Sequence, residues 1–379
     1  MDGVQAPLSG VQQALDVLNL EGAHADEGTM PVGRRPGKAP IGLDIEPGFV
    51  AAVQASAGTA SVERAAVAQI PPAVVSDGEV VDIHTLSEVL QKLFADHKFG
   101  KHVRIGVANQ RIVVRTIDLP PLAEDKEIAS AIRFQAPEHI PMPLEQAVLA
   151  HHSLGIVQTE DGPRTRVVLV AARRDMIDKL LAATRQAGLK PVGIDLSAFA
   201  MIRALHRPGV TGATLYVSAG GVTNLAVAVG ATCVFTRVVP YGTESMAAQL
   251  AERRGLTLEQ AHGWLKRVGL VDEVEEIEGE LEVVTEARGV LSDGLMRIAD
   301  DVRNSLDFYR MQESGAEIEH AVLTGPAAAI PGFCDALSEA VSLPFEAGVV
   351  GESRPGGFAG LDASQLVVAA GLTLDEVSA

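Results

Sequence analysis

Two segments of this chain repeat one pattern, in which an apolar stretch enters a glycine-containing turn and continues into a second apolar stretch. The first runs from Ile41 to Val53 and the second from Leu215 to Val227. Glycine adopts positive φ and lets other groups approach the backbone, and the N–H groups of such a turn can surround phosphate oxygens. Either segment alone can be an ordinary β-hairpin. Together they predict a cleft that holds a nucleotide from both sides.

The charge of the chain excludes two classes of partner. Its formal net charge is −18 at pH 7. Nucleic-acid binding needs basic residues that displace counterions from phosphates, and adhesion to anionic lipid needs them too, so neither is predicted. The longest apolar run, Val167 to Ala172, is far shorter than the roughly 20 residues of a membrane-spanning helix. We therefore expect a soluble protein with no direct membrane insertion.

Two further features predict the compartment. The N-terminal residues combine neither a basic region nor an apolar core, so no secretory signal is expected there. The chain has two cysteines, Cys233 and Cys334, both in apolar surroundings. Such residues are typical of buried thiols in a cytoplasmic protein rather than of a disulfide or a metal site. The predicted location is the cytoplasm.

The order of apolar patterns predicts two domains, the first interrupted by a smaller one. Residues 1–40 are rich in glycine, proline and charge and are predicted to be a disordered extension, with a short docking helix at Val11–Leu18 as an alternative. The predicted first domain comprises 41–118 and 188–210, and an α+β insertion comprises 119–187. The second domain covers 211–379, with a helical part at about 243–315. A length of 379 residues suits this division.

Local patterns predict strands alternating with helices, as in a mixed sheet with helices on its faces. The expected strands are 41–45, 49–56, 62–70, 103–108, 112–118, 148–154, 166–172, 191–195, 215–217, 224–229, 233–239 and 321–324. The expected helices are 83–94, 124–136, 175–187, 197–205, 244–254, 258–268, 289–312, one from 333, and 366–374. Pro137 is predicted to break the second of these helices, because proline lacks the N–H that continues a helix.

Six strings in this order resemble the PilM family, the actin-like proteins of type IV pilus assembly related to the division protein FtsA. They are Leu119-Pro-Pro-Leu122, Ala136 to Glu145, Val168 to Ala172, Ala187 to Asp195, Ser305 to Tyr309 and Leu323 to Gly332. The resemblance covers about Ile41 to Leu374. It implies an α/β, actin-like (FtsA-type) two-domain fold with an inserted small α+β subdomain, and a cleft for ATP or ADP with Mg²⁺.

The resemblance also implies which residues would bind the nucleotide. They are Asp44 and Gly48 in the first hairpin, Gly220, Gly221, Thr223 and Asn224 in the second, Lys266 beside the ribose, and Gly325 at the adenosine turn. No catalytic residue and no metal ligand are assigned. An alternative explanation is that Asp44 is a turn residue and Lys266 a surface charge.

The chain departs from the family pattern at several of these positions. Glu46 stands where the first turn usually has glycine, and a desolvated carboxylate there would repel phosphates. Ser218 replaces the aspartate that would hold Mg²⁺, a cation that favours carboxylate ligands. Gly263 replaces a glutamate beside the ribose, and Pro326 replaces a glycine, removing an N–H. We expect ATPase activity to be weak or absent, and nucleotide to bind as a structural element or not at all.

The resemblance implies a partner rather than a reaction. The family acts as a cytoplasmic scaffold, peripheral to the inner membrane, that binds the N-terminal cytoplasmic tail of a PilN-like inner-membrane protein, alongside other pilus assembly components. The expected groove lies between the first domain and its insertion, over Ile112 to Leu149. Its apolar residues Leu119, Leu122, Ile140 and Met142 are expected to be core rather than contact residues. Homo-oligomerisation stays open.

Two other functions use the same fold class. A small-molecule kinase would need a carboxylate base near the γ-phosphate, and Ser218 and Glu46 argue against one. An FtsA-like filament protein of the division site would need an amphipathic membrane helix, whereas the last eight residues, 372–379, are acidic.

Overall fold

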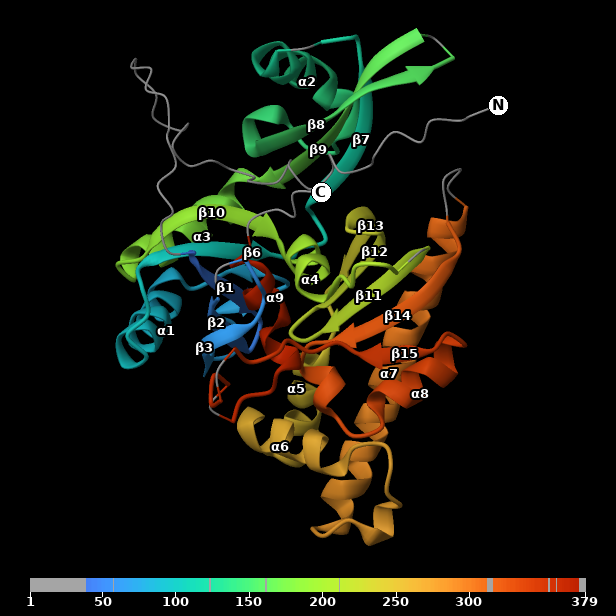
Figure 1. Ribbon diagram of the computed structural model, residues 1–379. Helices are drawn as coiled ribbons and strands as arrows, with labels where there is room; N and C mark the ends of the chain where they lie inside the picture. Colours follow the sequence, from blue (N-terminus) through green and yellow to red (C-terminus); the bar gives the residue numbers. More distant parts are fainter. Residues whose placement is uncertain are drawn as a thin grey trace.

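The structure, a computed structural model, describes residues 39–374 except 57, 123, 161, 211, 312–315, 354 and 359. The prediction of a disordered extension, with the alternative of a docking helix at 11–18, therefore lies outside the described residues for positions 1–38. The described part forms two five-stranded sheets and a third sheet of three strands (Figure 1).

The two large sheets share one plan. The first has the order β10-β6-β1-β2-β3 and the second β13-β12-β11-β14-β15. Their strands are β1 (Ile41–Glu46), β2 (Phe49–Ala55), β3 (Val62–Gln69), β6 (His102–Val107), β10 (Lys190–Leu196), β11 (Ala213–Ala219), β12 (Thr223–Val229), β13 (Thr232–Val239), β14 (Ile318–Thr324) and β15 (Phe345–Ala347). In each sheet the central strand forms an antiparallel hairpin with the next strand and pairs in parallel with a later one. β1 and β11 are buried along their whole length, including polar residues such as Asp44, Glu46 and Ser218.

Two short helices fill the space between the large sheets. α4 (Ser197–Leu205) and α9 (Val367–Gly371) pack with β2, β11 and β12 in one apolar core (Figure 1). Glycine permits the close approach of these elements, because a Cβ at Gly42 would collide with the carbonyl of Ala369 and a Cβ at Gly371 with that of Ala200. The two domains are thus joined by a packed layer.

Gly371→Ala is expected to lower the free energy of unfolding by about 1–3 kcal/mol, because the added methyl group forces α9 away from α4. Gly289→Ala is the matched control, since Gly289 is exposed on a helix with open space around it. That control is expected to stabilise the chain by about 0.5–1 kcal/mol, the helix propensity difference. Urea unfolding of both variants measures the contrast, and equal effects would contradict the packing argument.

The outer faces of the large sheets are covered by the remaining helices. α1 (Ile83–Asp96) and α3 (Arg174–Gln186) pack on the first sheet, with the short hairpin β4 (Val75–Ser76) and β5 (Glu79–Val80) at its margin. The second sheet is covered by α5 (Thr243–Arg254), α6 (Leu258–Val268), α7 (Leu281–Arg310) and α8 (Phe333–Val341). None of the helices described here is long and apolar enough to cross a membrane.

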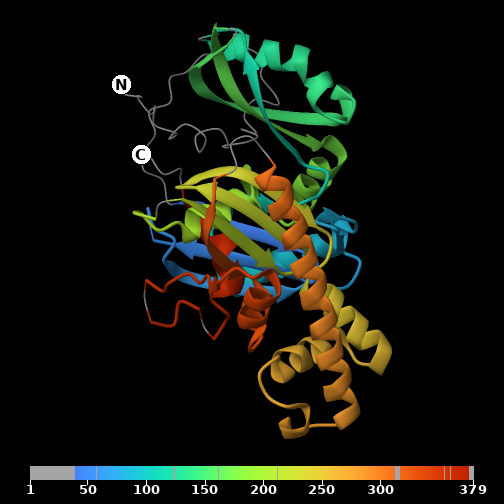
Figure 2. The same cartoon turned by 90° about the vertical axis from the view of Figure 1, so that its right-hand side faces the viewer.

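The third sheet belongs to the insertion. It has the order β7-β9-β8, with β7 (Val113–Leu119), β8 (Ala147–Thr159) and β9 (Gly162–Arg173), and α2 (Asp125–His139) packs against it. It lies at the opposite end of the molecule from the helical part around α6 and α7 (Figure 2). Leu119 and Ile140 are buried in its core, and Leu122 and Met142 pack on that core.

The packing shifts both predicted boundaries of the insertion. β7 was assigned to the first domain, but it pairs with β9 because its apolar residues Val113 and Ile117 face α2. α3 was assigned to the insertion, but Met176 and Leu180 lie in the core of the first domain. Pro137 also fails to end α2, which continues to His139. Proline removes its own N–H and crowds the carbonyl four residues earlier, but only two helical residues follow Pro137, so little of the helix depends on that turn.

Candidate functional site

The two glycine hairpins meet across the gap between the domains. The first turn, between β1 and β2, contains Gly48 with φ +89°. The second turn, between β11 and β12, contains Gly220 and Gly221. The Gly221 N–H donates to Oε2 of Glu46 at 2.7 Å, and Gly221 has no space for a Cβ because the Pro47 carbonyl lies against it. The predicted facing of the two hairpins is present, and they are in direct contact.

Two carboxylates are buried at this contact. Asp44 and Glu46 are two positions apart on β1, so they lie on the same face of the strand. They are 2% and 4% exposed, respectively. Burial raises the pKa of Asp44 well above its usual range, and the neighbouring charge of Glu46 raises it further. Burial also raises the pKa of Glu46 to about 7, although hydrogen bonds from the N–H groups of Gly221 and Val222 partly oppose this shift. The cleft is therefore lined by acidic groups where a nucleotide would place its own negative charges.

These shifts predict a pH dependence of stability. In the unfolded chain Glu46 titrates near 4.5, so between about pH 4.5 and 7 the folded chain holds a proton that the unfolded chain releases. The free energy of unfolding should therefore decrease as the pH rises through this window, by up to about 1.4 kcal/mol per pH unit, and Asp44 acts in the same direction. Glu46→Gln should flatten the slope in urea unfolding measured from pH 5 to 8. An equal slope in both proteins would contradict the prediction.

A cavity of about 270 Å³ opens beside this contact. It is lined by Pro47, Gly48, Phe49, Gln69, Gly221, Thr243, Glu244, His262, Gly263, Leu265, Lys266, Pro326, Ala329, Ile330, Asp362 and Gln365. Nε2 of His262 and Oε2 of Glu244 are 2.7 Å apart, while the Lys266 ammonium is 3.9 Å from Asp362 and largely exposed. Gly48, Gly221 and Lys266, predicted from the sequence, thus share one cavity.

The other predicted nucleotide residues are engaged elsewhere. The Thr223 hydroxyl donates to the Tyr241 carbonyl at 2.7 Å, which fastens β12 to the end of β13. Gly325 has φ +77°, and its N–H donates to the Ser364 carbonyl at 3.2 Å. Asn224 of β12 lines a different cavity, which lies where the insertion meets both domains. The predicted set is therefore only partly assembled around one cavity.

A bound nucleotide with Mg²⁺ does not fit this donor set. The N–H group of Gly221 already binds a carboxylate, and Ser218 offers no charge to a cation. Within the described ranges, no three His, Cys, Asp or Glu side chains gather closely enough to hold a metal ion. The residues at the contact suit two domains bound to each other better than two domains bound to a triphosphate.

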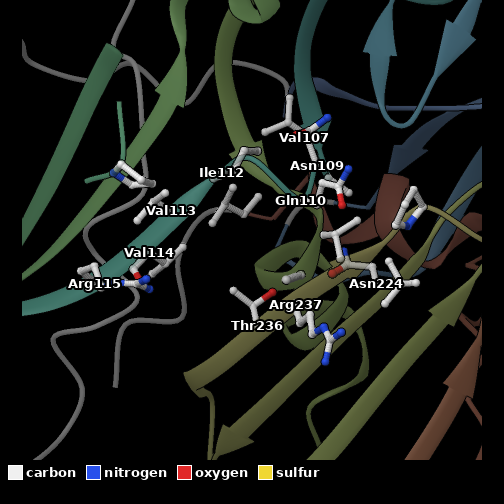
Figure 3. Close-up of a pocket in the computed structure, with 17 residues that line it drawn as sticks. Val107, Asn109, Gln110, Ile112, Val113, Val114, Arg115, Asn224, Thr236 and Arg237 are labelled. Atoms are coloured by element: carbon white, nitrogen blue, oxygen red, sulfur yellow. The ribbon is translucent and has the colours of Figure 1, made fainter. Parts of the chain in front are cut away.

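A second cavity, of about 480 Å³, lies where the insertion meets both domains (Figure 3). Its lining residues are Val107, Ala108, Asn109, Gln110, Ile112, Val113, Val114, Arg115, Pro141, Leu196, Ala198, Asn224, Thr236, Arg237, Val238, Val239 and Pro240. Figure 3 shows Val113, Val114 and Arg115 of β7 on one side, and Asn224, Thr236 and Arg237 of the second domain across from them. We call it the insertion cavity.

Asn224 is one of two buried polar residues that line the insertion cavity, the other being Asn109. Asn224 is 2% exposed, and its Oδ1 has no hydrogen-bond partner among the described residues. A buried carbonyl oxygen without a donor carries a desolvation penalty of about 1–3 kcal/mol, which a ligand N–H could remove. The sequence predicted Asn224 to lie in the nucleotide cleft. It did not predict Arg115 and Arg237 as cavity residues, because they are far apart in the chain and belong to no motif.

Comparisons with known proteins agree with this architecture. The sequence profile of the type IV pilus assembly protein PilM family matches residues 42–376. The solved structure of a PilM-PilN type IV pilus biogenesis complex is similar, with 23% identity, 88% of this chain and 97% of that chain covered, and a TM-score of 0.72. The ethanolamine utilization protein EutJ from Carboxydothermus hydrogenoformans has 16% identity, covers 90% of both chains and has a TM-score of 0.50. The predicted actin-like α/β fold is confirmed.

Proposed function

The chain belongs to the PilM family of type IV pilus assembly proteins, and on that basis we propose that it is a cytoplasmic scaffold that binds the N-terminal tail of a PilN-like inner-membrane protein in the insertion cavity. The solved relative is a complex of PilM with PilN. Through such a partner the protein would lie at the inner membrane without inserting into it, beside other pilus assembly components.

The sheet edges around the insertion cavity support an extended peptide as its occupant. β7 is the edge strand of the insertion sheet and β13 is the edge strand of the second large sheet. Val113 and Val114 of β7 and Thr236 to Val239 of β13 line the cavity. An edge strand offers unpaired N–H and C=O groups, so an extended tail between β7 and β13 can add backbone hydrogen bonds to either sheet.

The side chains of the insertion cavity support the same occupant. Its walls combine aliphatic side chains, such as Val107, Ile112 and Val238, with polar ones, such as Gln110 and Thr236. Asn224 supplies a buried acceptor, and the exposed Arg115 supplies positive charge at the rim. The guanidinium of Arg237 instead bonds to Ser305 and pairs with Asp301 at 3.8 Å. A peptide with alternating apolar side chains, an N–H for Asn224 and an acidic or carbonyl group for Arg115 would match this arrangement.

The proposed scaffold has a degenerate nucleotide cleft and no turnover. Glu46 and Asp44 place two buried carboxyl groups at the contact between the hairpins, and Ser218 stands at the position expected to hold the metal. A phosphoryl-transfer enzyme depends on cations and donors aimed at the γ-phosphate. In isothermal titration we expect no heat with Mg-ATP up to millimolar concentration. ATP hydrolysis that rises with a hydroxyl-bearing substrate would favour a kinase instead.

Fluorescence anisotropy of a labelled tail peptide tests the scaffold function. The probe is a synthetic peptide of the first 15 or so cytoplasmic residues of the PilN-like protein encoded with this chain. We expect saturable binding with a Kd in roughly the micromolar range, unchanged by Mg-ATP. A peptide of the same composition in scrambled order is the control. Equal binding of both peptides, or no binding of either, would contradict the proposal.

A further inference from the structure

The second glycine turn presents its backbone donors to a side chain of the protein itself. Glu46 closes β1, and its Oε2 accepts the N–H of Gly221 at 2.7 Å from a position 175 residues earlier in the chain. The N–H of Val222 also bonds to this carboxylate. Two successive N–H groups converging on one anionic group are the arrangement by which glycine-rich turns bind phosphate. Here the anion is a carboxylate of the opposite domain.

No space remains between the two turns for another group of that size. A Cβ at Gly220 would collide with Oε2 of Glu46, and one at Gly221 would collide with the carbonyl of Pro47. The first turn of α5 also fixes the second glycine turn, because the Thr243 hydroxyl donates to the Gly220 carbonyl at 3.2 Å. The carboxylate therefore meets donors that are already fixed in place.

We propose that the carboxyl group of Glu46 takes the place of a nucleotide phosphate in joining the two domains. In a nucleotide-dependent actin-like protein the two phosphate-binding turns need a ligand between them, whereas here one turn carries the ligand on its own strand. The inference deepens the proposed loss of nucleotide chemistry and rests on it, but it is independent of tail binding.

The charges around Glu46 agree with this role. Asp44 lies on the same strand and is 2% exposed, so an incoming phosphate would face two buried carboxyl groups, which gain negative charge as the pH rises. On the side of α5, Glu244 lies against Gly48 and pairs with His262 at 2.7 Å. Among these four ionisable residues only His262 can carry positive charge, and the Glu244 carboxylate lies beside its ring and would offset that charge. The contact thus disfavours an additional anion, while the N–H groups of Gly221 and Val222 bind the carboxyl group of Glu46.

A carboxyl group of the chain itself in place of a phosphate has a consequence for the insertion cavity. That cavity takes residues from the first domain, such as Val107, and from the second, such as Thr236. Its width therefore depends on how the domains are set against each other. If Glu46 fixes this setting, the cavity keeps one shape without nucleotide, which suits a scaffold that is always ready to bind its partner.

Hydrogen exchange of the amides of residues 219–223 tests the inference in the full chain. Glu46→Gln retains an acceptor oxygen, whereas Glu46→Gly removes the side chain. Glu63→Gln is the matched control, because Glu63 is a part-buried carboxylate of the same sheet that bonds Gln54 and Ser56, away from the cleft. We expect Glu46→Gly to exchange these amides at least ten times faster than the wild type. Glu46→Gln and Glu63→Gln should change the rate far less.

Pyrophosphate is the second probe. We expect the wild type to show no binding of it in titration and no change in amide exchange, and Glu46→Gly to bind it at least tenfold more tightly than the wild type. Slower exchange of the wild-type amides in saturating pyrophosphate would overturn the inference, even if Glu46→Gly did not fold. Unchanged exchange in a folded Glu46→Gly protein would overturn it as well. Failure of the tail peptide to bind would refute the scaffold function and leave these outcomes unaffected.

Discussion

Thr236→Trp is expected to weaken binding of the tail peptide at least a hundredfold. Thr236 is part-buried on β13 and pairs with Ala226, so it faces the same side as Asn224 and the insertion cavity. An indole at this position would occupy the space that we assign to the peptide and would cover the edge of β13. A hundredfold change corresponds to about 2.7 kcal/mol, which is within the range for a central interface position.

The matched control for this variant is Val234→Trp. Val234 lies on the same strand, is 44% exposed and does not line the insertion cavity. Both proteins carry the same added side chain, so a general effect of tryptophan on solubility or on β13 would appear in both. We expect Val234→Trp to bind the peptide within about threefold of the wild type. Equal loss in the two variants, measured by anisotropy at matched thermal stability, would place the peptide elsewhere.

The sequence predicted the frame well because the frame is local. The runs of buried residues in β1 and β11 and the glycine turns after them are features of consecutive residues, and the resemblance to the PilM family is confirmed over residues 42–376. The short strands β4, β5 and β15 escaped prediction, because two or three residues cannot establish an alternating pattern.

The site was harder to predict because it depends on contacts between distant residues. Glu46 was noted as a charge that would repel phosphate, but the sequence could not reveal that it bonds to Gly221 across the domain interface. Thr223 and Asn224 were assigned together to the nucleotide cleft. Neighbouring residues of a strand face opposite sides, so Asn224 reaches the insertion cavity while Thr223 bonds to Tyr241. Nucleotide binding itself stays a prediction.

Arg203→Met is expected to lower the free energy of unfolding by about 3–5 kcal/mol. Arg203 of α4 forms a buried ion pair with Asp195 of β10, and both side chains are less than 5% exposed. Its Nε also donates to the Gly371 carbonyl at 3.3 Å, and Asp195 accepts the N–H of Leu196 at 2.7 Å. Removing the guanidinium leaves a buried carboxylate without its partner, which is the costly case for a buried pair. Urea unfolding measures the loss.

Two further variants separate the charge effect from the loss of packing. The double variant Asp195→Leu with Arg203→Met removes both charges and should recover most of the lost stability, because an apolar pair of similar volume often replaces a buried ion pair without penalty. Arg207→Met removes the same group from an exposed pair with Glu346 at 2.9 Å and should change stability by less than about 0.5 kcal/mol. If the double variant were no more stable than Arg203→Met, the loss would come from packing. The pair joins β10, α4 and α9. If the lost stability comes from charge, this ion pair, in addition to the apolar layer, holds the two domains in their relative position.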